Sequence, residues 1–523
     1  MPNRPKKIRF YEFGAGDPLA ALIRLGRNQA NYLHNYLEAL GALSVIEEQN
    51  YFDRDYLDEF SAFYSISSSG YSNVCRRLHF FSTTLNRSAF RRVAGGSKRA
   101  LVNLKENYLG FVVIRPIPDA PLGRTVLRWF QDNDLTLPRI TEPSRQYVIH
   151  LAGVSLSVKG LAWQQQDSAV GACATIGLWT LLHSSAFDDI HAVPTTVEIT
   201  MAANRNNFLG KPPFPSQGLT RFQISECVKQ HKLTPLIVES DVKDIHGNPK
   251  GFSRNRFCAN CAAFIRSGYP VLIWVRGHTV PHIVVIGGFR SSNPNSIADG
   301  DIGFDAQDMP YVYIHDDNIG PHVRFRIDTV VEQYVDANGQ QQSIEYVKLV
   351  ADPPATNVGN VGVPSVQINY PELIPDFILA AGHEQIRSSP DTLSIKAMQL
   401  ANITSSIFKA VGINMAVVVS SRFIKLSNYL GNEMDRILGG NNRLLSRVRL
   451  ELCEKVSPMS LHIGLVRVGM RNGLELGDVL YDTTDSDRNH PAFVCISYNP
   501  AMSAVFNWQI NNGSINAVLI EAF

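Results

Sequence analysis

Residues 164–182 read QQQDSAVGACATIGLWTLL, and this stretch decides how the rest of the chain is interpreted. A polar loop of small residues ends at Cys173, and an apolar run follows it. The pattern predicts that a helix begins at Cys173. A helix N-terminus carries about half a positive charge, which favours the thiolate form of a cysteine placed there. Cys173 is therefore a candidate nucleophile, although taken alone it also suits a buried thiol at the start of a core helix.

Two later segments supply the groups that a nucleophilic cysteine requires. Residues 281–289 read PHIVVIGGF, which predicts a buried strand that begins at His282. Residues 311–321 read YVYIHDDNIGP and place Asp316 where a further strand ends. A cysteine nucleophile needs a base for its proton and a partner that orients the base. Cys173, His282 and Asp316 fit these roles in this order, although a strand histidine and a turn aspartate also have purely structural uses.

Residues from about 160 to 325 resemble the papain-like superfamily of cysteine peptidases. The likeness is greatest to the peptidases that remove double-glycine leaders from bacteriocins and to phytochelatin synthases. Four segments carry it in the same order: the glutamine-to-cysteine loop, GLT at 218–220, GYPV at 268–271 before the His282 strand, and IHDDNIGP at 314–321. The resemblance implies a helix that begins at the nucleophile and packs on an antiparallel sheet, which carries the histidine and the aspartate.

A glutamine upstream of the cysteine can donate its side-chain amide to the oxyanion of the reaction. Gln166 is the candidate, but it stands one residue further from Cys173 than the corresponding glutamine usually does in those relatives. Gln165 is therefore the alternative. Asp317 follows Asp316 where the relatives usually have proline, which leaves Asp317 as the alternative orienting group.

The length of 523 residues predicts more than one domain. We expect an α+β protein with an N-terminal α/β accessory domain over 1–155, a papain-like peptidase domain over 156–352 and a C-terminal α/β accessory domain over 370–523. Residues 353–369 are rich in Pro, Gly and Asn, which predicts a linker. Helices are expected, among other places, over 18–40, 219–230, 254–267, 371–381 and 393–410.

The composition excludes several classes of protein. Hydrophobic residues make up 45% of the chain and charged residues 18%, as in folded globular proteins rather than disordered ones. Seven cysteines, an odd number, argue against a disulfide framework. No apolar run approaches the roughly 18 residues that a membrane helix requires. We therefore expect a reduced, cytoplasmic protein without membrane association.

Charge is spread unevenly, although the net charge is only +2. Residues 71–128 hold eleven basic and two acidic residues. Such a run is most often a solvated face. The alternative is a surface that binds an anionic ligand or a regulatory protein. No nucleic-acid motif accompanies the run, so a nucleic-acid partner is not expected.

Cys258, Cys261, His278 and His282 come close to the spacing of a zinc finger. The apolar run between the cysteines and the histidines predicts a buried strand, whereas a finger needs a helix that carries both histidines. We therefore expect no metal at these residues and no cofactor elsewhere.

Together these features predict a cytoplasmic cysteine peptidase that cleaves a peptide or isopeptide bond in a peptide or protein substrate and is regulated by its flanking domains. Two alternatives remain open. The same triad could transfer an acyl or peptidyl group, as in phytochelatin synthases. The fold could also be a catalytically inactive scaffold that senses or binds a partner.

Overall fold

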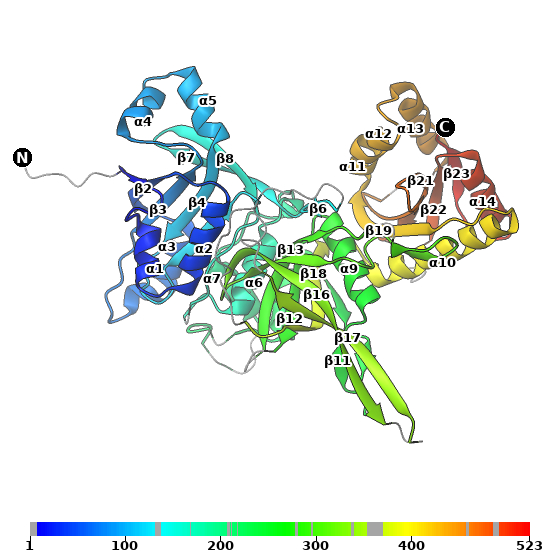
Figure 1. Ribbon diagram of the computed structural model, residues 1–523, viewed down its shortest axis with the longest axis horizontal. Coiled ribbons are helices and arrows are strands. Elements are labelled where there is room, and N and C mark those ends of the chain that lie inside the picture. The colour runs from blue at the N-terminus through cyan, green and yellow to red at the C-terminus, as the bar shows by residue number, and fades with distance from the viewer. Residues whose placement is uncertain are drawn as a thin grey trace, which may run out of the picture.

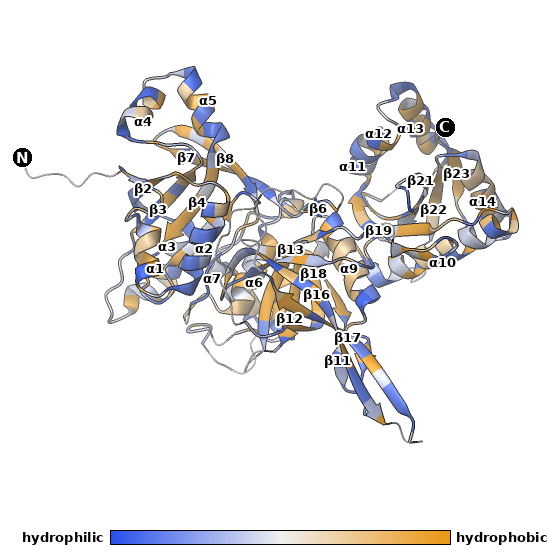
Figure 2. Cartoon of the chain, in the orientation of Figure 1, coloured by the Kyte–Doolittle hydropathy of each residue, from blue (hydrophilic) through white to orange (hydrophobic). Residues whose placement is uncertain are grey.

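A computed structural model describes residues 8–130, 137–167, 169–206, 210, 212–216, 218–277, 281–293, 296–335, 339–352, 370–456, 460–484 and 491–523. Helices and strands are both abundant, and three large sheets each carry helices of their own (Figure 1). The α+β class expected from the sequence is confirmed. Hydrophobic residues concentrate on the strands of these sheets, as Figure 2 shows.

The N-terminal sheet has five strands in the order β1-β2-β3-β4-β5, and every neighbouring pair is antiparallel. All seven residues of β4 are buried, so this strand forms the middle of the local core. The elements of this part are β1 Ile8–Glu12, α1 Pro18–Arg24, α2 Asn28–Ala39, β2 Ser44–Tyr51, α3 Arg54–Ala62, β3 Cys75–Phe81, α4 Arg87–Ala94, α5 Lys98–Glu106, β4 Tyr108–Ile114, β5 Leu122–Leu127, β6 Arg139–Ile140, β7 Arg145–Leu151 and β8 Val154–Gly160.

The single helix expected over 18–40 is wrong, because the structure divides this stretch into α1 and α2. Gly26 lies between them with a φ of 75°, a backbone conformation that favours glycine and ends a right-handed helix. Asp17 caps α1 by accepting hydrogen bonds from the backbone N–H groups of Leu19 and Ala20.

The central sheet has the order β17-β16-β15-β13-β12-β18-β9, with β6 beside β13, and all its pairs are antiparallel. Helix α6 packs against β13 and β12, and the long β16–β17 hairpin extends away from the body of the molecule (Figure 1). The elements here are α6 Cys173–Leu182, α7 Thr196–Ala203, α8 Arg221–Gln230, β9 Leu233–Glu239, β10 Val242–Lys243, β11 Pro249–Gly251, α9 Arg254–Arg266, β12 Val271–Arg276, β13 His282–Arg290, β14 Ile302–Phe304, β15 Tyr311–Asp316, β16 Gly320–Val335, β17 Gln341–Ala351 and β18 Ile374–His383.

The helix expected over 371–381 is also wrong, since β18 occupies this stretch. A short apolar run suits a buried strand as well as a buried helix, and only its partners decide between them. Here the partners are β12 and β9, which pair with β18 on either side. The chain therefore returns to the central sheet after the linker predicted over 353–369, which lies outside the described residues.

The C-terminal sheet has the order β14-β19-β20-β21-β22-β23, so β14, which precedes β15 in the chain, pairs with a strand more than a hundred residues later. Its two faces bury separate apolar clusters, one beneath α10 and α14 and one beneath α12 and α13. The elements are α10 Pro390–Ala410, β19 Val417–Lys425, α11 Leu426–Asn428, a π-helical turn Tyr429–Glu433, α12 Met434–Ile437, α13 Asn442–Lys455, β20 His462–Met470, β21 Glu475–Asp482, β22 Ala492–Ser497, α14 Pro500–Asn511 and β23 Val518–Glu521.

Candidate active site

Helix α6 begins at Cys173, as the sequence predicts. Cys173 is half-buried, and the nine residues that follow it in the helix are all buried. A helix buried on every side is fixed by packing rather than by an amphipathic pattern. The backbone N–H groups of its first turn have no acceptor within the helix. The thiol of Cys173 therefore lies beside backbone donors at the exposed end of a rigid element.

Gly177 lets α6 approach the central sheet closely. A β-carbon at this position would lie 3.0 Å from Cγ2 of Ile283 and 3.4 Å from Cδ1 of Leu272. Ile283 follows His282 on β13, so the same contact sets the distance between the start of α6 and the start of β13. The absence of a side chain at Gly177 thus helps to bring Cys173 and His282 together.

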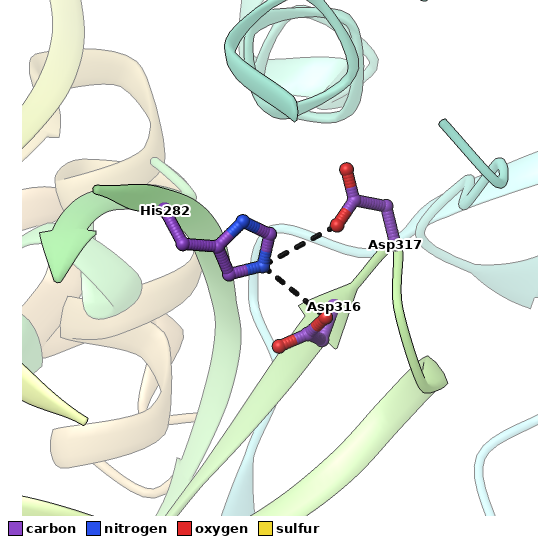
Figure 3. A group of neighbouring side chains, drawn as sticks. All are labelled: His282, Asp316 and Asp317. Carbon is purple, nitrogen blue, oxygen red and sulfur yellow. Dashed lines mark hydrogen bonds and ion pairs between the residues drawn. The ribbon is translucent and has the colours of Figure 1, made fainter. Parts of the chain in front are cut away.

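His282 connects the thiol to a buried carboxylate. A hydrogen bond to the side chain of Cys173 is among the influences that raise the pKa of its ring. Its Nε2 lies 3.3 Å from Oδ1 of Asp316, which comes from the end of β15 (Figure 3). Because Nε2 faces the carboxylate, Nδ1 is the nitrogen left for the thiol. The structure therefore brings the three expected residues of the triad together in one chain of contacts.

Three further groups hold Asp316, which is fully buried, two through its carboxylate and one through its backbone. Its Oδ1 accepts a hydrogen bond from the backbone N–H of Asn318 at 2.8 Å. Its Oδ2 accepts one from the hydroxyl of Tyr370 at 2.5 Å. Its backbone carbonyl accepts one from Nε1 of Trp163 at 2.8 Å. Sequence reasoning missed Tyr370, which no local pattern connects with the turn.

Asp317 lies as close to the imidazole but is held differently. Its Oδ1 is 3.4 Å from Nε2 of His282, an ion pair without hydrogen-bond geometry (Figure 3). Neither carboxylate oxygen of Asp317 has a hydrogen-bond partner among the described residues, and the side chain is buried. Asp316 is thus the hydrogen-bonded partner of His282, and Asp317 is a second carboxylate beside it.

The charges of the site follow from these contacts. Burial disfavours the imidazolium, but the hydrogen bonds to Asp316 and Cys173 and the charges of both aspartates raise the pKa of His282 to about 11. Burial alone would raise the pKa of Asp316, yet the hydrogen bond and the charge of His282 lower it. Burial raises the pKa of Asp317 to about 7 against the attraction of His282. At neutral pH the imidazolium is therefore paired with the carboxylate of Asp316.

The structure separates the two candidate glutamines. Gln166 is half-buried, and its Nε2 donates to Oδ1 of Asn318 at 2.9 Å. The amide of Asn318 also lies 3.3 Å from Nε2 of His282. Gln165 is buried, and its Oε1 accepts a hydrogen bond from the backbone N–H of Leu122 in the N-terminal sheet. Gln166 thus faces the triad, whereas Gln165 faces away from it. Asn318, which links Gln166 to His282, is a further site residue that the sequence reasoning passed over within its turn.

The loop before Cys173 is folded around Asp167. Oδ1 of Asp167 accepts hydrogen bonds from three backbone N–H groups, those of Ala169, Val170 and Gly171. Oδ2 lies 3.4 Å from the guanidinium of Arg115. Loops with their own internal hydrogen bonds of this kind hold one conformation. These hydrogen bonds tie Asp167, the neighbour of Gln166, to residues 169–171 just before Cys173.

Glu59 of α3 ties this loop to the N-terminal sheet. Its Oε2 accepts from Arg115 at 3.0 Å, and its Oε1 accepts from Gln164 at 3.0 Å and from Thr196 of α7 at 2.7 Å. Burial raises the pKa of Glu59 to about 7, although Arg115 opposes the shift. Sequence reasoning missed this cluster because its members come from four separate segments.

The turn that carries the aspartates is held from α2. The hydroxyl of Tyr32 donates to the backbone carbonyl of Pro321 at 3.0 Å, and Nε2 of Gln29 lies 3.5 Å from the backbone carbonyl of Asp317. The N-terminal part thus supports both sides of the site, the nucleophile loop and the aspartate turn.

The residues of the zinc-finger alternative are not gathered in the described part of the chain. Cys258 and Cys261 are buried on α9, and burial raises the pKa of both thiols. His278 lies outside the described residues. Among the residues that the structure describes, one set of His, Cys, Asp and Glu side chains has the proximity of metal ligands, and it comprises His282, Asp316 and Asp317.

The basic run lies largely on the projecting helices α4 and α5, where Figure 2 shows much hydrophilic colour. All six of its basic residues there are exposed, and none forms an ion pair with another described residue: Arg87, Arg91, Arg92, Lys98, Arg99 and Lys105. An anionic ligand or regulatory protein at this surface stays a prediction. Within the described ranges, no helix combines the length and the apolar character needed to cross a bilayer.

Comparison of the chain with models of protein families, with curated proteins and with solved structures finds no match in any of the three.

Proposed function

We propose that the chain is a cysteine peptidase with a papain-like core, in which Cys173 attacks the carbonyl of a peptide or isopeptide bond. One observation carries the proposal: Nε2 of His282 lies 3.3 Å from the carboxylate of Asp316, and hydrogen bonds to that carboxylate and to the side chain of Cys173 raise the pKa of the ring. A thiol nucleophile, a base and a buried group that orients the base are the parts that this chemistry requires.

Each step of the proposed cleavage can be assigned to a side chain or backbone group of the site. The sulfur of Cys173 bonds to the carbonyl carbon, and the carbonyl oxygen takes the electron pair. The Nε2–H of Gln166 and the backbone N–H of Cys173 are the donors for that oxygen. When the C–N bond breaks, the leaving amine takes the proton of His282. A water molecule then gives its proton to His282 and its oxygen bonds to the acyl carbon; the C–S bond breaks, which restores the thiolate of Cys173 beside the imidazolium of His282.

The surroundings suit the ion pair that the reaction uses. His282 is 5% exposed and Asp316 fully buried, so their attraction acts in a medium of low dielectric constant. Asp316 keeps the imidazolium charged and oriented while the thiolate attacks. Tyr370 and the backbone of Asn318 keep Asp316 ionised, because both donate hydrogen bonds to its carboxylate.

The test is the mapping of newly formed protein N-termini in cells that express the wild type or Cys173→Ala. We expect one or a few cleavage sites that occur with the wild type and are absent with Cys173→Ala and with His282→Ala. Cys453→Ala, which removes an exposed cysteine on α13, is the matched control and should cleave like the wild type. Identical N-termini with the wild type and Cys173→Ala, at equal protein levels, would favour the inactive scaffold instead.

A further inference from the structure

One ring nitrogen of His282 faces two carboxylates. Its Nε2 lies 3.3 Å from Oδ1 of Asp316 and 3.4 Å from Oδ1 of Asp317 (Figure 3). A protonated Nε2 has a single N–H to donate, and the hydrogen bond goes to Asp316. The triad therefore uses one of the two acids and leaves the other without a role.

Asp317 is the acid that the triad does not use, and burial of its carboxylate is energetically unfavourable. The side chain is 3% exposed, and neither oxygen has a donor with hydrogen-bond geometry among the described residues. The backbone N–H groups of Asp317 and Asn318 lower the pKa of this carboxyl, but by less than burial raises it. A buried carboxylate without hydrogen bonds needs a compensating charge or a proton. The shared imidazolium supplies one positive charge for two negative ones.

The three atoms have the spacing of ligands around one small cation. Zinc binds imidazole nitrogen and carboxylate oxygen at about 2.0–2.2 Å, so neighbouring ligand atoms in a tetrahedral site are about 3.4 Å apart. The two nitrogen-to-oxygen distances match this value, and all three atoms lie within 4.8 Å of one another. A dication would also balance the charge of both carboxylates.

The surroundings provide the outer contacts that a metal site needs. Asp316 is oriented by Tyr370 and by the backbone N–H of Asn318, and outer hydrogen bonds of this kind fix the ligands of metal sites. The side-chain oxygen of Asn318 accepts a hydrogen bond from Gln166, so a water molecule is the neutral ligand for the fourth position.

We propose that His282, Asp316 and Asp317 bind a Zn²⁺ ion, and that the ion and the thiol chemistry exclude each other. The metal takes the place of the proton on Nε2, which leaves to solvent. The ring then keeps one proton, on Nδ1, and gives it to the leaving amine far less readily than an imidazolium does, because its loss would turn the metal-bound ring into an imidazolate. Binding of zinc stands independently of the proposed function, whereas its inhibitory effect rests on that function.

The binding test uses the full-length chain carrying Cys173→Ala, so that the nucleophile cannot hold the metal. The protein is stripped with a chelator and titrated with Zn²⁺ alone. We expect one zinc per chain. Adding Asp317→Asn should weaken binding by about tenfold or more, because a charged ligand is lost while the shape is kept. Asp328→Asn changes the charge equally on β16, away from the site, and should leave the affinity unchanged.

X-ray absorption of the zinc-loaded Cys173→Ala protein gives a second readout that needs no further variant. We expect nitrogen and oxygen neighbours only, at about 2.0–2.1 Å. Sulfur in the first shell would place the ion at Cys258 and Cys261 and overturn the proposal. Absence of stoichiometric zinc, or an affinity unchanged by Asp317→Asn, would overturn it as well.

The inhibitory effect has its own readout, the rate at which the wild type cleaves at the sites mapped for it. We expect zinc to slow this cleavage, and Asp317→Asn to require about tenfold more zinc for the same effect. If the stripped Cys173→Ala protein binds zinc but cleavage by the wild type is unaffected, the site stands and the exclusion is overturned. A wild type that cleaves no protein, with zinc bound as expected, would contradict the peptidase function alone.

Discussion

Asp316 and Asp317 are neighbours in sequence and lie almost equally far from Nε2 of His282, yet their surroundings differ. Asp316 accepts hydrogen bonds from Tyr370 and Asn318, whereas Asp317 accepts none from the described residues. Hydrogen bonds to the ionised form favour it, so Asp316 is the acid that supports a cationic imidazole. The difference between the two acids is therefore one of partners and not of distance.

His282→Ala should abolish turnover, because proton transfer to and from the substrate contributes about 10²–10⁴-fold and has no other carrier. Asp316→Ala should be milder by about tenfold, since the hydrogen bond to Cys173 also orients the ring. Asp317→Ala should be milder still. Steady-state kinetics of the three variants measure this order. A larger loss in Asp317→Ala than in Asp316→Ala would show that the roles of the two acids are reversed.

Gln166→Ala should lower kcat by roughly 10²–10³-fold, the usual cost of one lost oxyanion donor. Gln165→Ala is the matched control, because its side chain is directed to the backbone of Leu122. It should change the melting temperature more than kcat. If kcat falls further in Gln165→Ala than in Gln166→Ala, the oxyanion donor has been assigned to the wrong glutamine.

At the level of elements, the site depends on how closely α6 approaches β13. Gly177 permits the contact with Ile283, the residue next to His282. Alanine is about 1 kcal/mol better than glycine in a helix interior, but an added methyl group in a packed core costs about 1–3 kcal/mol. The gain in helix propensity and the cost of overpacking largely cancel in the free energy of unfolding. Nothing cancels the displacement of α6 that the added methyl group causes.

Gly177→Ala should therefore lower the alkylation rate of Cys173 while the melting temperature changes little. The reason is that the β-carbon, 3.0 Å from Cγ2 of Ile283, pushes the start of α6 away from His282. Removing Cγ2 as well, in Gly177→Ala with Ile283→Ala, should restore part of the rate. A wild-type rate in Gly177→Ala alone would show that this contact does not set the site.

At the level of the whole molecule, the central sheet and the N-terminal part form the site together. The central sheet supplies His282 and Asp316, and the N-terminal part holds the loops around them through Tyr32, Glu59 and Arg115. These contacts are buried, so a displacement of the N-terminal part would move catalytic groups. The flanking region is thus placed to influence activity, as regulation by an accessory domain requires.

Glu59→Gln tests this support through the pH dependence of stability. Burial raises the pKa of Glu59 to about 7, so between about pH 4.3 and 7 the folded state holds a proton that the unfolded state has lost. This contribution is complete below that window and is lost as pH rises through 7, an effect on the order of 3 kcal/mol. Thermal or denaturant melts from pH 5 to 8 should show a flatter profile for Glu59→Gln than for the wild type.

The absolute stability of Glu59→Gln should fall at every pH, because an amide N–H₂ would face Arg115 or Gln164. A parallel shift of the two pH profiles, without a change of slope, would mean that Glu59 does not titrate in this window. The change of slope is thus the observation that separates titration from simple loss of a hydrogen bond.

Local patterns identified the elements that carry the triad but not everything that surrounds it. The helix at Cys173 and the strand at His282 follow from an apolar run after a polar loop, which is a local signal. The predicted helix over 371–381 failed because strand β18 is defined by its partners β12 and β9, distant in sequence. The sequence alone could not distinguish a helix from a strand in a short apolar run, because the strands that pair with it are distant in the chain.

The same limit applies to the site. Asn318 stood within a turn already identified, so a local signal for it existed. Tyr370, Glu59 and Arg115 reach the site from segments far apart in the chain, and no spacing connects them with Cys173. The hydroxyl of Tyr370 donates to Asp316, a contact that the sequence could not predict, so Asp317 stayed open as the alternative to Asp316.

The central claim is that His282 activates Cys173, and the chain contains its own reference thiol. Cys453 is exposed on α13, whereas Cys173 is half-buried. The measurement is the ratio of their iodoacetamide alkylation rates at pH 6, read by peptide mass spectrometry in the wild type and in His282→Ala. We expect Cys173 to react at least about tenfold faster than Cys453 in the wild type, since His282 can take the proton of its thiol, and to lose that advantage in His282→Ala. A wild-type Cys173 that reacts no faster than Cys453, or whose rate is unchanged by His282→Ala, would contradict the claim.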